Sequence, residues 1–382
     1  MKKIIAILAM VALVGGVAFA EASVSGHFIG TVNLVESSTA DGAEMMGSAG
    51  KDRVRLEAQG SDEDGKFGGW FRVDGAHWSG NPVFAGHGWW KPIDQFLMRV
   101  GSNGGDGYYG KEGVTGWMFY QTVTDTGVAM GGDNVWGGTF YGGLGEGLDG
   151  SFNFRNAFYG GYGDDGLMLE IKPVEMFGLN IVLPYFEGGL VEDIFKDLLL
   201  QIDLNLDFGN IAFTYKGDAS GASGGNAFLY AGIGAIENVA LDIGLGLTLD
   251  GDVVKKAPLS VGLGAKVDIS ETFGLKARLG AGIPTDSDDK ITRILFDVLP
   301  YFAINDSMTV FVSLGLGLVD VDGEAVVGIH FNPYIQVGSE WGPKFLAGIK
   351  VWQNYTYDGK DMGTGGDSFI NWAIPIAINV GF

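Results

Sequence analysis

The chain contains no cysteine among its 382 residues and only four histidines. It therefore cannot form a disulfide or a thiolate zinc site, and it offers few ligands for a histidine-based metal site. Basic residues are also scarce, since Lys and Arg total 24 against 46 Asp and Glu, for a formal net charge of −22. Nucleic-acid binding needs cationic groups that neutralise phosphates, so we expect no nucleic-acid partner. We likewise expect no metal and no other cofactor.

Long apolar runs are nearly absent, and the one that exists lies at the N-terminus. Two lysines precede an apolar segment over residues 4–19, and residues 18–20 read Ala-Phe-Ala, which fits the small-x-small cleavage pattern. We predict a signal peptide over residues 1–20, cleaved after Ala20, and an exported chain. A membrane anchor is the alternative, but the run is short and the cleavage pattern follows it directly.

Glycine and apolar residues are abundant. The chain has 66 glycines, its hydrophobic fraction is 46%, and only 18% of its residues are charged. The usual glycine fraction is about 7%. The glycines follow no Gly-X-Y period, which excludes collagen, and the apolar fraction is too high for a disordered chain.

The dominant hydrophobic period is two residues. Over residues 198–208, apolar side chains occupy every second position, with Gln201 and Asp203 among the residues between them. The same alternation is found over residues 239–249, 259–269, 273–283 and, more briefly, 53–59. Successive side chains of a strand point to opposite faces, so these segments are predicted strands with one apolar and one polar face. A tilted strand needs about 9–11 residues to cross a bilayer, and the longer segments meet that length.

The connections between the predicted strands also alternate in length. Short turns are expected near residues 209–210, 237–238, 270–271, 305–306 and 339–342, and longer loops over residues 217–225, 250–256, 285–290, 320–324 and 354–367. Short turns at one rim and long loops at the other are typical of a transmembrane β-barrel. We predict an all-β fold, a transmembrane antiparallel up-and-down β-barrel of 16–20 strands, forming a single domain over residues 21–382. A soluble sandwich is the alternative, but it should have shorter strands and a more highly charged outer face.

Aromatic residues gather near the ends of the predicted strands. Amphipathic rings favour the headgroup level of a membrane, so we expect these residues to form girdles there. The residues are Trp89, Trp90, Tyr185, Phe186, Tyr301, Phe302, Trp341, Trp352 and Trp372.

The last predicted strand, over residues 370–382, is apolar at every second place and ends on Phe382. It resembles the C-terminal strand of bacterial outer-membrane β-barrel proteins, and the whole chain resembles a porin. The resemblance implies insertion into outer-membrane lipid and recognition of Phe382 by the barrel-assembly machinery, with a homotrimer as one option for assembly. Pro375 lacks an N–H donor for the sheet, so a bulge or weak pairing is expected beside it.

In a barrel of this size the polar face would line an aqueous lumen, because side chains are too small to fill it. Charges on the lipid face would cost about 2–4 kcal/mol for Arg or Lys at mid-depth, which assigns the charged positions to the lumen. The predicted pore-lining residues are Arg53, Arg55, Glu57, Arg72, Asp74, Arg99, Lys276 and Arg278, with Asp203, Asp207, Asp242, Lys266, Asp268, Asp297 and Lys350 on the same face.

A long Gly- and aromatic-rich segment over residues 102–134 carries Asp106, Asp125 and Asp133. General porins fold one long loop into the barrel, with acids opposite a basic wall, so the resemblance makes this segment the candidate constriction loop. The nearby arginines of the pore-lining set would form the basic wall. Two alternatives are an extracellular loop that stays outside and a further hairpin through residues 117–121.

Motifs that look catalytic lack their structural context. Residues 221–225 match G-x-S-x-G, but no helical pattern follows them. Residues 145–150 match a dinucleotide fingerprint without a βαβ unit around it. We therefore predict that the chain is not an enzyme but a porin-like channel for passive diffusion of small hydrophilic solutes. The alternatives are a non-conducting surface barrel, such as an adhesin or structural envelope protein, and a selective transporter of sugars or hydrophobic compounds.

Overall fold

The computed structural model describes residues 21–38, 42–48, 53–76, 83–102, 165–184, 196–217, 225–249, 259–283, 292–321, 324–338, 343–353 and 370–381. These residues form twenty strands of one sheet, in which every pairing is antiparallel. The first ten strands are β1 (Glu21–Ser38), β2 (Gly42–Ser48), β3 (Arg53–Ser61), β4 (Phe67–Ala76), β5 (Val83–Ile93), β6 (Phe96–Ser102), β7 (Asp165–Val174), β8 (Phe177–Pro184), β9 (Leu199–Leu206) and β10 (Gly209–Lys216). The other ten are β11 (Asn226–Ile236), β12 (Val239–Thr248), β13 (Leu259–Asp268), β14 (Phe273–Ile283), β15 (Thr292–Asn305), β16 (Met308–Val321), β17 (Glu324–Gly338), β18 (Lys344–Gly348), β19 (Lys350–Gln353) and β20 (Ile370–Gly381).

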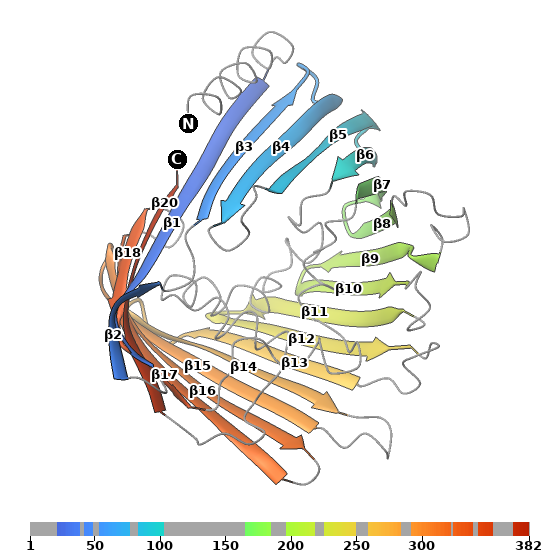
Figure 1. The fold of residues 1–382 in the computed structure, drawn as a ribbon. Coiled ribbons are helices and arrows are strands. Elements are labelled where there is room, and N and C mark those ends of the chain that lie inside the picture. Colours follow the sequence, from blue (N-terminus) through green and yellow to red (C-terminus); the bar gives the residue numbers. More distant parts are fainter. Residues whose placement is uncertain are drawn as a thin grey trace.

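The sheet closes on itself. From β3 to β17 each strand pairs with the next one along the chain, and β20 pairs with β1, where Val380 lies opposite Phe28. On its other side β1 pairs with β3, where Phe28 lies opposite Val54. Figure 1 shows the strands following one another around a ring, with β20 beside β1. This closure leaves no sheet edge, which a backbone in lipid requires.

The ring has 18 strand positions. β2 and β3 both pair with β1, along successive stretches of it, and β18 and β19 both lie between β17 and β20. Each of these two pairs therefore occupies one position, so the twenty strands fill 20 − 2 = 18 positions. An even number agrees with bacterial single-chain barrels, and the sequence-based prediction of an antiparallel barrel with 16–20 strands is confirmed.

The two faces of the sheet differ as the alternation predicts. On β12 and β13, Ile243, Leu245 and Leu263 are 39–41% exposed, whereas the glycines between them are buried. Large apolar side chains are exposed in the same phase around the ring, including Val54, Phe84, Val100, Phe213, Leu229, Phe296, Leu316, Phe331 and Ile378. The opposite phase carries the buried polar side chains. The outer face is thus a continuous apolar surface, and the polar set lies inside.

Short turns lie at one rim. Asp94 and Gln95 join β5 to β6, and Glu237 and Asn238 join β11 to β12, with Asn238 at a φ of 60°. A two-residue hairpin of this kind favours positive φ, which asparagine tolerates better than most residues. The ranges 77–82, 103–164, 185–195, 218–224, 250–258, 284–291 and 354–369 separate strands at the other rim.

The structure corrects two of the predicted connections between strands and locates the irregularity that was predicted near Pro375. The longer loop expected over residues 320–324 is wrong, because β16 continues to Val321 and β17 begins at Glu324. The turn expected at residues 209–210 falls two residues earlier, since Gly209 already begins β10. The irregularity expected at Pro375 is present, and the extra residue lies on β1, where the register shifts between Asn33 and Glu36.

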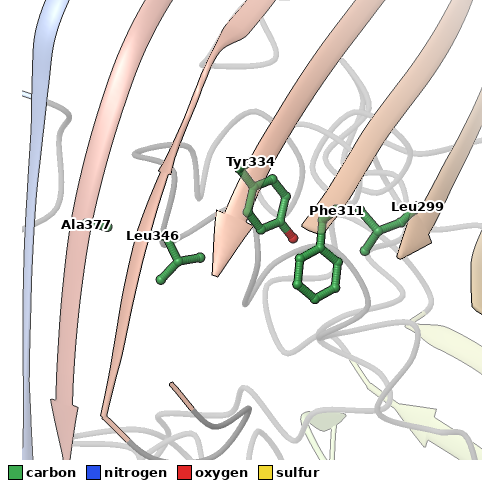
Figure 2. Packing of buried hydrophobic residues seen from close by; sticks show 5 residues of the cluster. All are labelled: Leu299, Phe311, Tyr334, Leu346 and Ala377. Atoms are coloured by element: carbon green, nitrogen blue, oxygen red, sulfur yellow. The ribbon is translucent and has the colours of Figure 1, made fainter. Parts of the chain in front are cut away.

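The strands of the C-terminal part carry a buried apolar cluster on the inner face. Leu299, Phe311, Tyr334, Leu346 and Ala377 come from β15, β16, β17, β18 and β20 and are all buried. Figure 2 shows their side chains lying side by side across these strands. A smaller buried cluster joins Met168, Val182 and Leu199. Within the described ranges, no helix is long and apolar enough to span a membrane.

Candidate channel lumen

A charged group on β3 and β4 lies on the inner face. Arg72 donates from Nε to Glu57 Oε1 at 2.6 Å, and the Arg55 guanidinium lies 3.6 Å from the same oxygen. Glu57 lies opposite Arg72 in the strand register, and Arg55 is two residues before Glu57, so the alternation places all three on one face. Arg72 is almost completely buried, while Arg55 and Glu57 keep 17% and 24% exposure. The Glu57 carboxylate is therefore shared by two guanidinium groups.

Aromatic rings continue this surface across β4 and β5. The Trp70 and His87 rings lie opposite each other with centroids 5.3 Å apart, and the Trp89 ring is 6.2 Å from His87. The Arg72 guanidinium lies 4.8 Å from the centre of the Trp70 ring. All three rings are half-buried, so each presents part of its surface to the lumen.

Arg99 on β6 extends the same row. It lies opposite Trp89 on one side and Met168 on the other, and its side chain is half-buried. Glu170 follows on β7 and forms an ion pair of 3.1 Å with Lys172. The wall made by β3 to β7 thus carries both signs of charge.

An amide network covers the inner face of β8, β9 and β10. Asn180 and Gln201 donate from their amide nitrogens to the two oxygens of Asp203, at 3.1 and 2.5 Å. Thr214 donates its hydroxyl to Gln201 Oε1 at 3.3 Å. Gln201 lies between Asn180 and Thr214 in the strand register. Neutral amides and hydroxyls that line a lumen can exchange hydrogen bonds with water or with a polar solute.

A second charged group lies on β13, β14 and β15. Lys266 forms a 3.0 Å ion pair with Asp268, and the Tyr301 hydroxyl donates to the other oxygen of Asp268. Lys276 lies opposite Lys266 and is buried. The Tyr301 ring then packs against Phe311, with centroids 6.0 Å apart.

The inner face of β16 to β20 carries a cluster of buried apolar side chains. The Phe311 and Tyr334 rings are stacked, 4.9 Å apart at an interplanar angle of 9°. Leu346 and Ala377 lie opposite each other on β18 and β20, and both are almost fully buried. Ser313, Asn332, Gln336 and Lys344 add buried polar groups to this part of the described wall.

Solved structures match the fold of this chain, although no family model and no curated protein matches the sequence. An engineered triple mutant of the Rhodopseudomonas blastica porin matches with a TM-score of 0.51 and 10% identity, over 95% of this chain and 100% of that chain. The anion-selective porin from Comamonas acidovorans gives 0.51 and 12%, over 95% and 100%. OmpT of Vibrio cholerae, in a trimer form, gives 0.51 and 12%, over 95% and 99%. The chain has a porin fold.

Within this porin fold, the predicted pore-lining residues fall into three groups. Arg55, Glu57 and Arg72 are brought into contact, Arg99 lies farther along the same wall, and Lys276 is far from all of them in the strand order. For Arg53, Asp74 and Arg278 the structure describes backbone positions alone, and their register is that of the inner face. The constriction-loop acids Asp106, Asp125 and Asp133 and the terminal Phe382 lie outside the described residues.

The aromatic girdle prediction needs correction. Trp90, Phe302 and Trp372 are in the outward phase, and Trp90 and Phe302 are 38% and 49% exposed. Trp89 and Tyr301 instead face inward, because they contact His87 and Asp268 on the lumen wall. Trp352 has the register of the inner face, opposite His330, while Tyr185, Phe186 and Trp341 lie outside the described residues.

The sequence-based reasoning missed the inward aromatic and apolar side chains. Trp70 is in phase with Arg72, and Tyr334 is in phase with Asn332 and Gln336. Residues two positions apart on a strand point to the same face, so these polar neighbours could have placed both rings inside the barrel. No cluster of three metal-ligating side chains occurs in the part of the chain that the structure describes.

Proposed function

We propose that this chain is an outer-membrane channel for the passive diffusion of small hydrophilic solutes. The observation that carries the proposal is the closed ring of 18 strand positions with ionic and amide groups on its inner face. A barrel of 16–18 strands is too wide for side chains to fill and leaves an aqueous lumen. An apolar outer face holds such a ring in lipid, while the inner face offers hydrogen bonds to solutes in transit.

The proposal includes the route to the membrane and the assembled state. The signal peptide over residues 1–20 is removed after Ala20, and residues 21–382 fold as one barrel domain. The barrel-assembly machinery recognises the last strand through Phe382. A trimer is supported by the trimer form named for the Vibrio cholerae OmpT structure, which shares the fold. The channel needs no cofactor and performs no catalysis.

A constriction is part of the same proposal. Ser102 at the end of β6 lies opposite Asp165 at the start of β7, so residues 103–164 connect two neighbouring strands of a ring that is closed without them. We assign the constriction to residues 102–134, with Asp106, Asp125 and Asp133 facing the basic side chains of the β3 to β6 wall. Acids opposite arginines would create a transverse field that filters solutes by charge.

Planar-bilayer recording of the purified protein tests the channel. We expect stepwise conductance increases and a reversal potential in a salt gradient that reports charge selectivity. A heat-denatured sample of the same preparation is the control. Protein that shows a β-sheet circular dichroism spectrum in detergent, inserts into lipid and still stays silent would contradict the channel proposal.

A loop replacement tests the constriction separately. Residues 103–164 are exchanged for a short Gly/Ser linker, which can join Ser102 to Asp165 because these residues already lie opposite each other. We expect a larger single-channel conductance from a folded barrel. Equal conductance in the parent and the shortened chain would contradict the proposed constriction but not the proposed channel.

A further inference from the structure

The short turns at one rim of the barrel carry acidic residues. Seven such turns are described between β3 and β16, and every one of them contains at least one Asp or Glu. All of these acids are exposed except Asp62, which is half-buried. We name this set the acidic collar, and its nine residues are Asp62, Glu63, Asp64, Asp94, Glu175, Asp207, Glu237, Glu271 and Asp306.

The topology places all seven turns at the same rim. Each turn joins two antiparallel neighbours, and the turns recur at every second strand around the ring. Strands lie about 4.8 Å apart and tilt by about 40° in a barrel, so neighbouring turns are about 12 Å apart along the rim. Acids on different turns are too far apart to hold one ion between them. The collar therefore acts through its electric field and not as a binding site.

Lysines pair with the collar on one side of the ring only. Lys66 lies 3.7 Å from Asp64, and Lys91 lies 3.0 Å from Asp94. Among the residues that the structure describes, no cation forms an ion pair with the acids of the turns from β9 to β16, which are Asp207, Glu237, Glu271 and Asp306. Nine acids and two lysines give these turns a formal charge of 2 − 9 = −7.

Apolar neighbours fix the level of the collar relative to the membrane. Phe208 follows Asp207 and is 48% exposed, and Ile236 precedes Glu237 and is 50% exposed. These side chains continue the apolar outer face up to the turn, where the acids begin. Because a carboxylate is far more costly in hydrocarbon than in water, the acids lie on the aqueous side of this edge. The collar thus surrounds one mouth of the barrel.

We propose that the acidic collar makes this mouth selective for cations, so that cationic solutes pass it more readily than anionic ones. The ring of 18 strand positions has a radius of about 18 Å. At that distance a charge of −7 in water enriches a monovalent cation at the centre of the mouth about fourfold in about 0.01 M salt. The inference rests on the proposed channel for transport, but the field exists whether or not the barrel conducts.

Salt separates the collar from charges deeper in the barrel. The Debye length falls from about 30 Å in 0.01 M salt to about 10 Å in 0.1 M and about 3 Å in 1 M. The enrichment at the centre of the mouth therefore falls below about twofold in 0.1 M salt and disappears in 1 M. Charges on the lumen wall, which a solute passes more closely, keep their effect at higher salt.

Reversal potentials at several salt concentrations test the effect on transport. The collar variant combines Asp207→Asn, Glu237→Gln, Glu271→Gln and Asp306→Asn. The matched control combines Asp207→Glu, Glu237→Asp, Glu271→Asp and Asp306→Glu, which keeps every charge. We expect the cation-to-anion permeability ratio of the collar variant to fall about fivefold in about 0.01 M salt, less than about twofold in 0.1 M and not at all in 1 M. The control should follow the parent at each concentration.

A spin label measures the field without a conducting channel. The chain contains no cysteine, so Thr272→Cys carries a single label on an exposed residue beside Glu271. The full chain is folded in an uncharged detergent, and collisions of the label with a cationic and an anionic relaxation agent are compared. The cation-to-anion collision ratio should be at least about fivefold higher in the labelled parent than in the labelled collar variant in about 0.01 M salt.

Two results would overturn the proposal: equal permeability ratios in the collar variant and its control at low salt, and equal collision ratios in the labelled parent and the labelled collar variant. The two measurements also separate the collar from the channel. A silent bilayer together with a cation-favouring label contradicts the channel and supports the collar. A conducting barrel whose label favours neither agent contradicts the collar alone.

Discussion

The two sides of the barrel are built from the same two-residue alternation but differ in length and in what they place inside. Strands β3 to β6 have 7 to 11 residues, and their inner face carries half-exposed rings and ion pairs. Strands β15 to β17 have 14 or 15 residues, and their inner face carries a buried apolar cluster beside a few buried polar side chains. About 9–11 residues suffice to cross a bilayer, so the longer strands extend beyond it. One side of the ring is thus suited to contact solutes, and the other to stabilise the barrel.

Among the substitutions that test this comparison, removal of a buried leucine should lower the free energy of unfolding the most. Leu346→Ala leaves a cavity in the apolar side and should lower the free energy of unfolding by about 3 kcal/mol. Leu314→Ala removes the same atoms from an outward leucine that is 39% exposed, so its loss should be roughly half as large. Denaturant unfolding in lipid vesicles, followed by tryptophan fluorescence, measures both. Equal losses would mean that the apolar cluster is no more tightly packed than the outer face.

The next largest effect should come from the charged side. Glu57→Gln removes the carboxylate that Arg55 and buried Arg72 share, and should lower the free energy of unfolding by about 2 kcal/mol. The change should also shift the reversal potential toward anions. Glu170→Gln is the control, because its partner Lys172 is 46% exposed and such pairs contribute only about 0–1 kcal/mol. Similar losses of unfolding free energy in the two variants would show that Glu57 stabilises the barrel no more than an exposed ion pair does.

A smaller effect is expected where the two kinds of wall meet. Tyr301→Phe removes the hydroxyl that donates to Asp268 but keeps the ring that packs against Phe311. Asp268 retains Lys266 at 3.0 Å, so the free energy of unfolding should fall by only about 1 kcal/mol. Thermal unfolding in detergent measures the change. A loss as large as that of Leu346→Ala would assign the stabilising role to the polar contact instead.

The smallest effect should appear in selectivity alone. Arg55→Gln removes one lumen charge. At about 8 Å in water that charge attracts an anion and repels a cation by about 0.5 kcal/mol each, and screening at about 0.1 M salt roughly halves both energies, so the permeability ratio should change about twofold toward cations. Lys66→Gln removes the same charge from an exposed turn and should leave the ratio unchanged. Reversal potentials in a salt gradient compare the two. An identical shift in both variants would show that position on the wall is irrelevant to selectivity.

The parts of the fold that follow from periodicity could be predicted from the sequence. The outward phase of Leu245 and Leu263, the inward phase of Gln201 and the irregularity beside Pro375 all follow from side-chain alternation and from the missing proline donor. The direction of Trp89 was not predicted, because its place near a strand end suggested the membrane interface. Trp89 points inward because it lies two residues after the inward His87, and the glycine opposite it leaves room for the indole ring.

Composition and alternation are enough to predict an all-β fold with an apolar outside and a polar inside, and the N-terminal residues predict export. The contacts between inward side chains depend on the register of the strands, which brings together Glu57 with Arg72, Trp70 with His87, and Phe311 with Tyr334. The reason lies in the period of the pattern. A slip of one residue between neighbouring strands would turn every apolar side chain inward, so the sequence excludes it. A slip of two residues leaves every face unchanged and replaces every partner, so alternation alone cannot distinguish between these registers.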